Sequence, residues 1–347
     1  MAVVATLGWR WFGHDTFLVA ALVAAAGLIW SSRERKAWLL AAGIVAVGIF
    51  WSSREDSGCS AWWRGQIVYQ KLAGHFPFIG WRDIWRAAVA PCSATRRPAP
   101  KDLERAKLLH EKLVDGQKWE QYQTDLGTFW MPAPGRNMLV WILWEMTVQR
   151  DYTSDGVAIR PGDTVIDGGA HVGVFSAYAL RQGAARVVAI EPDPTNITCL
   201  EANLAPEIAS GRVVVVKVGI WDRKDSRSLT HVEQNSAQDS FVMNLPEGSK
   251  IGSLPVLPLD DIVEQLNLDH VDFIKMDIEG AERRALLGAR RTLGRFKPRM
   301  AICTYHLEDD PVVIPSLVRT LQPSYQVHAK DVEYLLRRVT TKVLFFR

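Results

Sequence analysis

The fold is decided by a glycine-rich stretch near the middle of the chain, which reads Val165-Ile166-Asp167-Gly168-Gly169-Ala170-His171-Val172-Gly173. The stretch lies where a predicted strand at 164–166 ends and a predicted helix at 174–181 begins. Glycines at such a turn let the backbone bend tightly and let a ligand approach the main chain. The amino terminus of a helix also offers free N–H groups. The stretch therefore predicts a ligand-binding loop between a strand and a helix.

An acidic residue at the end of the next predicted strand is expected to bind the same ligand as this loop. Glu191 follows the strand at 186–190 and lies 22 residues after Gly169. A carboxylate at that spacing can accept hydrogen bonds from both hydroxyls of a ribose. The two features together predict a site for a cofactor that contains adenosine. A glycine-rich turn without a ligand is the alternative for the loop alone.

The glycine spacing distinguishes between two such cofactors. A nicotinamide dinucleotide fingerprint requires G-x-G-x-x-G to hold a pyrophosphate, whereas the glycines here follow G-G-x-x-x-G. Asp167, directly before the first glycine, would repel a pyrophosphate but suits a ligand with an ammonium group. S-adenosylmethionine carries an ammonium, a sulfonium and no phosphate. It is therefore the cofactor that the loop favours.

Strands and helices alternate on the carboxyl-terminal side of this loop, after a predicted hairpin at 119–131 and a helix at 138–148. Such alternation is typical of an α/β fold in which helices cover both faces of a parallel sheet. The four consecutive valines at 213–216 suit a strand that is buried on both sides. We expect strands at 164–166, 186–190, 212–218, 271–276, 299–303, 325–329 and 339–346, and helices at 174–181, 195–204, 259–266, 281–292 and 313–321.

A second motif, residues 271–282, joins a later strand to the next helix. Lys275, Asp277 and Glu279 occupy alternate positions, so their side chains point roughly the same way. A lysine in a buried strand is costly unless it is paired, and Asp277 or Glu279 is the obvious partner. If the sheet order reverses between the first and fourth strands, Asp167 and Asp277 face one ligand-binding crevice. We interpret Lys275 as a structural ion pair and Asp277 as a functional residue.

A third motif, residues 304–310, places His306 just after the following strand. An imidazole there could take a proton from an acceptor hydroxyl or bind the substrate. It could also join Asp277 and Glu279 as a ligand of a divalent metal, or be an ordinary surface-loop residue. The predicted catalytic residues are Asp277 and His306, and a metal site of Asp277, Glu279 and His306 is the alternative.

Two apolar runs, 17–30 and 37–51, open the chain, and neither contains a charge. With their flanking residues each reaches about 17 residues, the lower bound for crossing a hydrocarbon core. The segment 27–34 resembles 48–55 at an offset of 21 residues, which indicates a short duplication. A signal peptide explains only the first run, and a soluble hairpin needs polar faces. We predict a two-helix transmembrane hairpin over 1–55.

The segment after the hairpin is rich in tryptophan, since nine of the 14 tryptophans precede residue 90. Indole favours the headgroup zone of a bilayer, so 56–100 is expected to form interfacial helices or helices packed on the catalytic domain. A polar helix is expected from Lys101 to about Asp115, ending at Gly116. The predicted domains are the hairpin at 1–55, Trp-rich interfacial or linker helices at 56–115 and the catalytic domain at 116–347.

The overall composition limits the partners of the chain. The net charge of +3 is too small to argue for a nucleic-acid partner. The four cysteines are far apart, which excludes a zinc or redox spacing. Two of them, Cys199 and Cys303, fall in apolar periodic segments typical of core thiols, and a Cys59–Cys92 disulfide would require an oxidising compartment.

These motifs resemble the FkbM-type methyltransferases over about residues 162–325, near half of the chain. The resemblance implies a Rossmann-like class I methyltransferase fold with a mostly parallel, doubly wound sheet. It also implies S-adenosylmethionine as cofactor and O-methylation of a sugar, glycan, lipid-linked or natural-product hydroxyl. The resemblance rests on Gly162-Asp163-Thr164-Val165-Ile166-Asp167-Gly168-Gly169-Ala170, Ala189-Ile190-Glu191-Pro192-Asp193-Pro194, Leu257-Pro258-Leu259-Asp260-Asp261, Tyr305-His306 and, most specifically, Phe273-Ile274-Lys275-Met276-Asp277-Ile278-Glu279-Gly280-Ala281-Glu282.

The same resemblance extends the cofactor site to the segment after the third strand, which is expected to flank the adenine. The predicted cofactor residues are Asp167, Gly168, Gly169, Ala170, His171, Gly173, Glu191, Gly219, Ile220, Trp221 and Asp222. A divalent metal is left open. The apolar amino-terminal hairpin departs from the family pattern, so the bilayer is an expected partner and the acceptor class stays open.

Two other classes of protein remain as alternatives: a nicotinamide-dependent oxidoreductase and a catalytically inactive membrane scaffold on a methyltransferase fold. The counts of Lys and Arg around the hairpin do not orient it, with three in the interhelix loop against four in the flanks. S-adenosylmethionine is made and kept in the cytosol. We therefore expect a multi-pass membrane protein whose catalytic domain faces the cytoplasm.

Overall fold

The structure, a computed structural model, describes Lys71 and residues 98–114, 116–154, 156–231, 239–243, 249–330, 333–335 and 338–347. The two apolar runs lie outside these residues, as does the tryptophan-rich segment apart from Lys71. The predicted membrane hairpin and interfacial helices therefore stay predictions. Within the described part of the chain, no helix combines the length and the apolar character needed to span a bilayer.

Contacts divide the chain into two compact units. One comprises 97–330 and 341–347 and contains every predicted site residue. Its start lies ahead of the predicted boundary at residue 116. The other comprises 1–96 and 331–340, of which the structure describes Lys71 and an antiparallel strand pair, β13 (Glu333–Leu335) and β14 (Arg338–Thr340).

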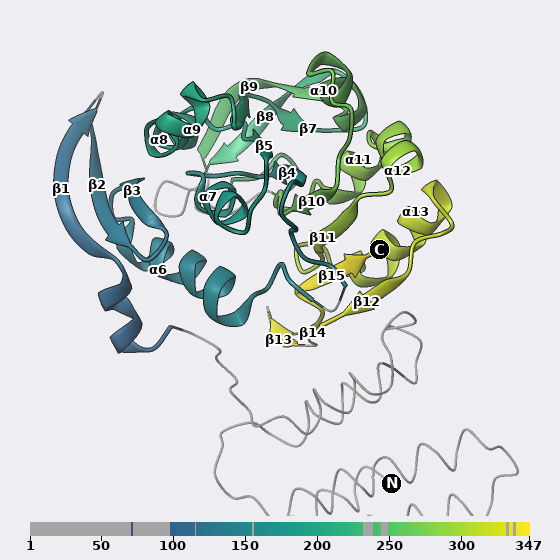
Figure 1. The fold of residues 1–347 in the computed structure, drawn as a ribbon, viewed down its shortest axis with the longest axis horizontal. Coiled ribbons are helices and arrows are strands. Elements are labelled where there is room, and N and C mark those ends of the chain that lie inside the picture. The colour runs from purple at the N-terminus through teal and green to yellow at the C-terminus, as the bar shows by residue number, and fades with distance from the viewer. Residues whose placement is uncertain are drawn as a thin grey trace, which may run out of the picture. The chain divides into compact units, whose positions relative to one another are not determined.

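A central sheet organises the larger unit. Within the described residues it has seven strands in the order β12-β15-β11-β10-β4-β5-β6 (Figure 1). Neighbours are parallel except that β15 runs antiparallel to β11 and β12. The order reverses between β4 and β10, as predicted. The strands are β4 (Thr164–Gly168), β5 (Arg186–Ile190), β6 (Val213–Val216), β10 (Phe273–Met276), β11 (Arg299–Cys303), β12 (Val327–Ala329) and β15 (Val343–Phe346).

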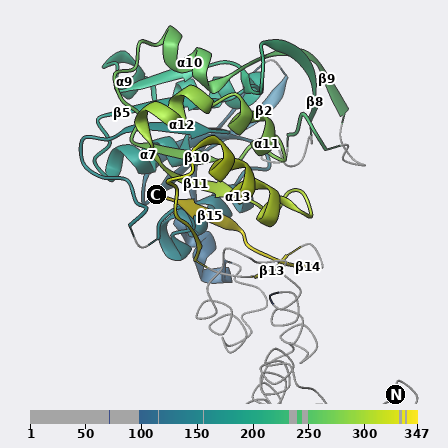
Figure 2. The ribbon, with the colours of Figure 1, turned by 90° about the vertical axis from the view of Figure 1, so that its right-hand side faces the viewer.

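Helices cover both faces of this sheet. Right-handed crossovers that run outward from β4 place their helices on one face, and those that run the other way from β10 use the opposite face. Figure 1 shows α7 to α9 on one side and α10 to α13 on the other, and the second group faces the viewer in Figure 2. The helices are α7 (Val174–Arg181), α8 (Pro194–Asn203), α9 (Ala205–Ala209), α10 (Leu259–Gln265), α11 (Glu282–Leu287), α12 (Arg290–Phe296) and α13 (Asp310–Leu321).

Burial explains why the central strands contain few polar residues. Every residue of β4 and of β10 is buried, because each strand has neighbours on both sides and helices on both faces. The mostly parallel, doubly wound sheet is thus confirmed, and the antiparallel β15 makes it mixed.

The single helix predicted at 281–292 is wrong. The structure has two helices, α11 and α12, which are separated at Gly288. The Gly288 carbonyl accepts a hydrogen bond from Asp260 N at 2.9 Å instead of continuing the helix. A Cβ atom on Gly288 would lie 2.1 Å from the Trp221 carbonyl oxygen, so the close approach of that loop requires glycine here.

The helix predicted at 101–115 is also wrong. A 3-10 turn, η1 (Pro100–Arg105), is followed by strand β1 (Lys107–Val114), which pairs antiparallel with β2 (Gln117–Thr124). Pairing with β2 satisfies the β1 backbone and overrides the weak helical preference of this polar segment. The predicted hairpin is confirmed as β2 and β3 (Gly127–Pro132), and α6 (Arg136–Trp144) with the π-helical turn η2 (Glu145–Gln149) follows it.

A second small sheet was not predicted. Strands β7 (Gly219–Ile220), β8 (Asp225–His231) and β9 (Ser249–Leu257) form it in the order β7-β9-β8. It is inserted between β6 and α10, and β7 begins directly after the third parallel strand. The insertion brings Asp239 and Phe241, which follow β8, to the wall of the pocket described below.

Candidate active site

A pocket lies at the carboxyl ends of β4, β5 and β10, where the sheet order reverses. The space within it, open solvent included, is about 510 Å³. Its lining comes from the loop after β4, the end of β5, the start of β7, residues 239–241 and the turn after β10. This is the crevice predicted for a doubly wound sheet.

The glycine-rich loop is held tightly against both neighbouring strands. The N–H groups of Gly169 and Ala170 both donate to the Ile190 carbonyl at 3.0 Å. Gly169 has a φ of +73°, and a Cβ atom there would lie 2.0 Å from the Asp277 carbonyl oxygen. Glycine is therefore required at 169 for both conformation and space. These two N–H groups are used within the protein rather than offered to a ligand.

Glu191 is the buried carboxylate at the end of β5. Its Oε2 accepts a 2.8 Å hydrogen bond from His171 N, and its Oε1 accepts from Asp193 N at 3.1 Å and Asn196 Nδ2 at 3.3 Å. A carboxylate has about four acceptor positions, so about one remains, on Oε2. That leaves room for one ribose hydroxyl, whereas the sequence predicted two. Burial raises the pKa of Glu191 to about 7, against the hydrogen bonds that lower it.

Asp167 lies beneath the loop and does not line the pocket. Its side chain is fully buried, 3.2 Å from Lys275 Nζ, and accepts a 2.7 Å hydrogen bond from Ser176 Oγ. Lys275 also donates to the carbonyls of Gly168 and Gly169, at 3.1 and 2.6 Å. The structural pair expected for Lys275 is present, but its partner is Asp167. Because Asp167 does not line the pocket, it does not make the contact with the ammonium group of a bound cofactor that the sequence predicted.

The segment after β6 contributes only its first residues. Gly219 and Ile220 line the pocket, whereas Trp221 and Asp222 do not. Trp221 is buried beside the guanidinium of Arg227, 4.2 Å from the ring centroid, and Asp222 pairs with Arg284 at 2.8 Å. Of the four residues predicted for this segment, the first two line the pocket and the last two do not.

Residues 239–241 form a wall that the sequence did not reveal. Asp239 and Phe241 line the pocket, and a Cβ atom on Gly219 would lie 2.4 Å from the Phe241 ring. Ser240 Oγ donates a 2.6 Å hydrogen bond to the Glu279 carbonyl and so fixes the segment to the turn after β10. No sequence signal connects this segment to the glycine-rich loop, because the insertion alone brings them together.

The turn after β10 supplies two carboxylates to the pocket, Asp277 and Glu279. Tyr152 donates a 2.7 Å hydrogen bond to Asp277 Oδ2. Although burial opposes ionisation, Lys275 and then His306 lower the pKa of Asp277. Burial raises the pKa of Glu279 and outweighs the contact with His306, which lowers it. Glu279 has a φ of +52°, a strained conformation for a non-glycine residue that is typical of functional sites.

His306 lies behind these carboxylates, with only 2% of its side chain exposed. Its Nε2 is 3.3 Å from Glu279 Oε1 and 3.5 Å from Asp277 Oδ1, and its Nδ1 is 3.0 Å from Glu282 Oε1. Burial acts against a charged imidazole, but Glu282 and Glu279 outweigh it and raise the pKa of His306 well above the ordinary value. The surface-loop alternative for His306 is therefore excluded.

The pocket brings together about half of the predicted cofactor residues. Gly169, His171, Glu191, Gly219 and Ile220 line it. Two others do not line the pocket but are constrained to glycine: a Cβ atom on Gly168 would lie 3.0 Å from Ile220, and Gly173 is the N-cap of α7 with a φ of +90°. Ala170 is buried in the core behind the loop. Asn196 also lines the pocket, and the Asp193 N-cap of α8 was the sequence signal that could have located it.

The strand order with an antiparallel β15, and a pocket at the carboxyl ends of β4 and β5, are those of the Rossmann-like methyltransferase fold. Residues 167–328 of this chain match the model of the methyltransferase FkbM domain family.

Three methyltransferases are similar to the chain over part of their length. A 31-O-demethyl-FK506 methyltransferase FkbM of Streptomyces tacrolimicus is 27% identical over 173 residues, which cover 42% of this chain and 66% of that protein. A methyltransferase, sdnD, of Sordaria araneosa is 24% identical and covers 40% of this chain and 64% of its own length. The crystal structure of a methyltransferase FkbM from Methylobacillus flagellatus is 26% identical, with a TM-score of 0.44, over 59% of this chain and 48% of that one. The chain thus spans less than two thirds of these relatives.

Proposed function

We propose that the chain is an S-adenosylmethionine-dependent O-methyltransferase whose cofactor lies in the pocket beside Glu191. The observation that carries this proposal is the charge of the pocket. Four carboxylates line it, those of Glu191, Asp239, Asp277 and Glu279, and no Lys or Arg lines it in the described part of the chain. A sulfonium and an ammonium suit such a lining, whereas a pyrophosphate does not.

The backbone of the loop supports the same choice. A nicotinamide dinucleotide needs main-chain N–H groups aimed at its pyrophosphate, but those of Gly169 and Ala170 are bound to the Ile190 carbonyl. Burial, and then Lys275, lower the pKa of His171 to about 3, so its imidazole adds no positive charge. The oxidoreductase alternative is therefore disfavoured by geometry as well as by glycine spacing.

The chemistry proposed is placement of a hydroxyl in line with the sulfonium methyl, together with removal of its proton. Bound S-adenosylmethionine would supply the methyl group: the new O–CH₃ bond would form as the S–CH₃ bond breaks, with S-adenosylhomocysteine as the leaving product. Asp277 and Glu279 reach the pocket and can accept the proton. His306 lies behind them, and its raised pKa favours the charged form, so it orients the carboxylates rather than acting as the first base.

An oxygen acceptor is supported by the Streptomyces relative, whose name describes methylation of an O-demethyl compound. The apolar runs in residues 17–51 support the further proposal of a bilayer-anchored enzyme that acts on a glycan or lipid-linked hydroxyl. Because S-adenosylmethionine is made and kept in the cytosol, we further propose that the catalytic domain faces the cytoplasm. Carbonate extraction should leave the full chain in the membrane pellet. Release into the soluble fraction would refute the anchor and leave the cofactor proposal intact.

Calorimetry tests the cofactor directly. The full chain in detergent should bind S-adenosylmethionine and S-adenosylhomocysteine at one site and should not bind NADH. Binding of NADH alone would favour the oxidoreductase. Binding of S-adenosylmethionine without label transfer to any membrane, glycan or small-molecule fraction would favour an inactive scaffold.

A further inference from the structure

We propose that Glu282 is a positioning residue that keeps both ring nitrogens of His306 protonated. The resulting imidazolium holds Asp277 in its ionised form and leaves Glu279 to accept the proton of the acceptor hydroxyl. The role of Glu279 rests on the proposed function, whereas the charge of His306 does not. The three acidic residues come from the end of β10, the turn after it and the start of α11, and the histidine comes from the loop after β11.

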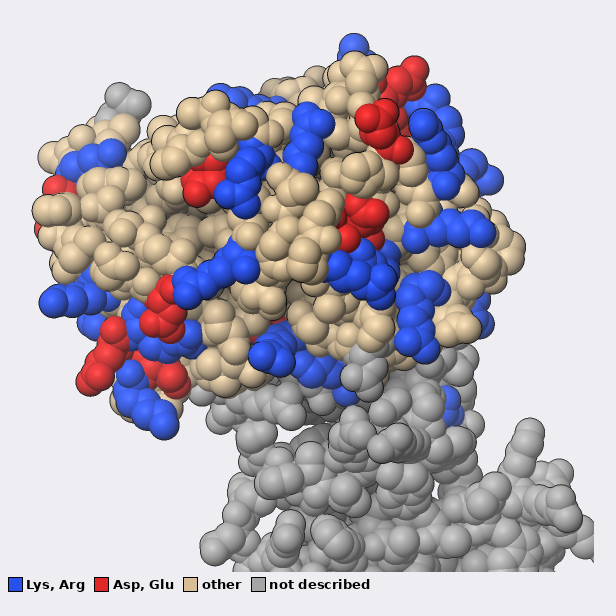
Figure 3. Space-filling view, in the orientation of Figure 1, with Lys and Arg blue, Asp and Glu red and all other residues tan. Residues whose placement is uncertain are grey.

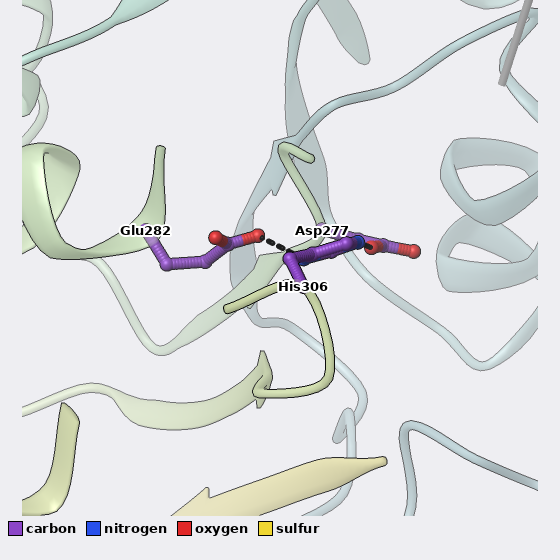
Figure 4. A group of neighbouring side chains, drawn as sticks. All are labelled: Asp277, Glu282 and His306. Atoms are coloured by element: carbon purple, nitrogen blue, oxygen red, sulfur yellow. Dashed lines mark ion pairs between the residues drawn. The ribbon is translucent and has the colours of Figure 1, made fainter. Parts of the chain in front are cut away.

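The first observation is that His306 has a carboxylate at each ring nitrogen. Its Nδ1 is 3.0 Å from Glu282 Oε1, and its Nε2 is 3.3 Å from Glu279 Oε1 and 3.5 Å from Asp277 Oδ1. Figure 4 shows the imidazole between Asp277 and Glu282. A neutral imidazole has one N–H and one lone pair, and a carboxylate would repel that lone pair. Both nitrogens therefore carry protons in this arrangement.

The second observation is that the Glu282–His306 pair is shielded from water. The Glu282 side chain is fully buried, and 2% of the His306 side chain is exposed. On the face in Figure 3, Asp and Glu side chains instead lie at the surface among Lys and Arg, where water and salt weaken ion pairs. In a buried pair, loss of one partner leaves an uncompensated charge. The imidazolium therefore depends on Glu282.

The third observation is that Glu282 is held in place by the backbone. Its Oε1 also accepts a 2.9 Å hydrogen bond from Ile278 N, and the residue lies in the first turn of α11. Glu282 does not line the pocket, so it acts through His306 rather than on a ligand.

The other charged and titratable groups around the imidazole do not replace Glu282. Arg283 on α11 pairs with Asp309 and Asp310, and Lys275 on β10 pairs with a carboxylate of β4. The Tyr305 ring lies beside the imidazole, with 4.1 Å between the ring centroids. Burial raises the pKa of Tyr305 well above its ordinary value, so that its phenol stays uncharged.

The two carboxylates of the pocket differ in what they can still accept. Asp277 Oδ1 is buried, and Asp277 Oδ2 accepts the hydrogen bond from Tyr152. Glu279 Oε1 contacts the imidazole, whereas Glu279 Oε2 has no hydrogen-bond partner among the described residues. Although burial opposes it, Lys275 and His306 lower the pKa of Asp277, whereas burial raises that of Glu279. Neighbouring carboxyls whose pKa values are separated in this way take different roles, and Glu279 is the better proton acceptor.

The proton balance of the step follows from these roles. The O–H bond of the acceptor breaks, its proton moves to Glu279, and the oxygen takes the methyl group as the bond between methyl and sulfur breaks. Glu279 then releases the proton to water at the mouth of the pocket. His306 keeps both protons throughout. A metal ion requires an unprotonated ring nitrogen, so the metal alternative for these residues is disfavoured.

Nuclear magnetic resonance of the full chain in detergent, with ¹⁵N-labelled histidine and no cofactor, tests the charge of His306. An ordinary histidine is neutral at pH 8.5, but His306, assigned by the signal that His306→Gln lacks, should be doubly protonated there. Glu282→Gln keeps an oxygen for Ile278 N and removes the charge. It should lower the pH at which His306 loses its second proton by at least about one unit. Glu264→Gln, which removes an exposed carboxylate on α10, should leave that pH unchanged.

A pair of ligands tests Glu279 without a known acceptor. Sinefungin carries an amine where S-adenosylmethionine carries its transferable methyl, and S-adenosylhomocysteine carries no group there. In calorimetry at pH 7 the parent chain should bind sinefungin more tightly than S-adenosylhomocysteine. Glu279→Gln should reduce that preference at least about tenfold, because a hydrogen bond to a charged acceptor is lost. Glu264→Gln should retain it.

Three results decide between the parts of the proposal. A neutral His306 in the parent at pH 8.5 overturns the role of Glu282, and so does an unchanged titration in a Glu282→Gln variant that circular dichroism shows to be folded. An unchanged preference for sinefungin in Glu279→Gln overturns the assignment of Glu279. If none of the three adenosyl ligands binds while His306 is doubly protonated, the proposed function and the role of Glu279 fail, and the role of Glu282 stands.

Discussion

Lowering the pH through neutrality should weaken cofactor binding, because protonation of Glu191 replaces a charged acceptor of the ribose hydrogen bond with a weaker, neutral one. Burial raises the pKa of Glu191 to about 7 in the free protein. Its Oε2 holds one hydrogen bond, from His171 N, and has one acceptor position left. A ribose hydroxyl bound there would stabilise the charged form, so binding should lower the pKa of Glu191 and release a proton.

The size of the effect follows from that pKa. Between pH 8 and pH 6 the ionised fraction of Glu191 falls about tenfold, and the affinity should fall with it by up to about tenfold, or about 1.4 kcal/mol. Stability of the free protein should change in the opposite direction. A carboxyl whose folded pKa is raised contributes stability that is present at low pH and is lost as the pH rises through about 7.

Calorimetry of S-adenosylmethionine binding at pH 6, 7 and 8, in two buffers of different ionisation enthalpy, measures both the affinity and the protons released. Glu191→Gln should remove the pH dependence and weaken binding at pH 8 by about 10–150-fold, the value of one hydrogen bond to a charged acceptor. Glutamine retains an oxygen for Asp193 N and Asn196 Nδ2. An affinity that is independent of pH in the parent, or unchanged in a folded Glu191→Gln variant, would refute the assignment of Glu191.

Three further predictions concern the loop and the residues beneath it. Gly169→Ala should destabilise the fold by about 2–5 kcal/mol in chemical denaturation, because its Cβ would meet the Asp277 carbonyl at 2.0 Å and its φ is +73°; parental stability would contradict this. Lys275→Met should cost about 3–5 kcal/mol by leaving Asp167 buried and unpaired, and adding Asp167→Asn should restore more than half of the loss; additive losses would argue against the pair. Tyr152→Phe should lower turnover at least about tenfold by releasing Asp277, while the S-adenosylmethionine affinity changes less than about twofold; a parallel loss of affinity would show that Tyr152 supports the pocket instead.

Local sequence signals were sufficient for the elements nearest the pocket. The helix 174–181 and the strands 186–190 and 299–303 have the predicted bounds, because apolar runs of strand length alternate there with capped helices. The loop after β4 and Glu191 also lie in one pocket, as their spacing predicted. Positive φ at Gly169 and the close approach of Asp277 explain why glycine marks that position.

Contacts between distant segments were beyond these signals. The sequence paired Lys275 with residues two or four positions away, whereas the structure pairs it with Asp167 on the neighbouring strand β4. Glu282 contacts His306 only because α11 begins beside the loop after β11. The β7–β9 sheet, with Asp239 and Phe241, depends on pairing across an insertion whose register is not visible in local periodicity.

The location of bound S-adenosylmethionine tests the central claim most directly. Ultraviolet crosslinking of the tritiated cofactor to the full chain, followed by peptide mapping, should place the label in peptides that contain 169–171, 190–196, 218–220, 239–241 or 277–281, and excess S-adenosylhomocysteine should remove it. A second cavity, lined by Arg105, Arg150 and Arg181, provides the contrast. Competable label in peptides from that cavity, or no competable label anywhere, would contradict the account.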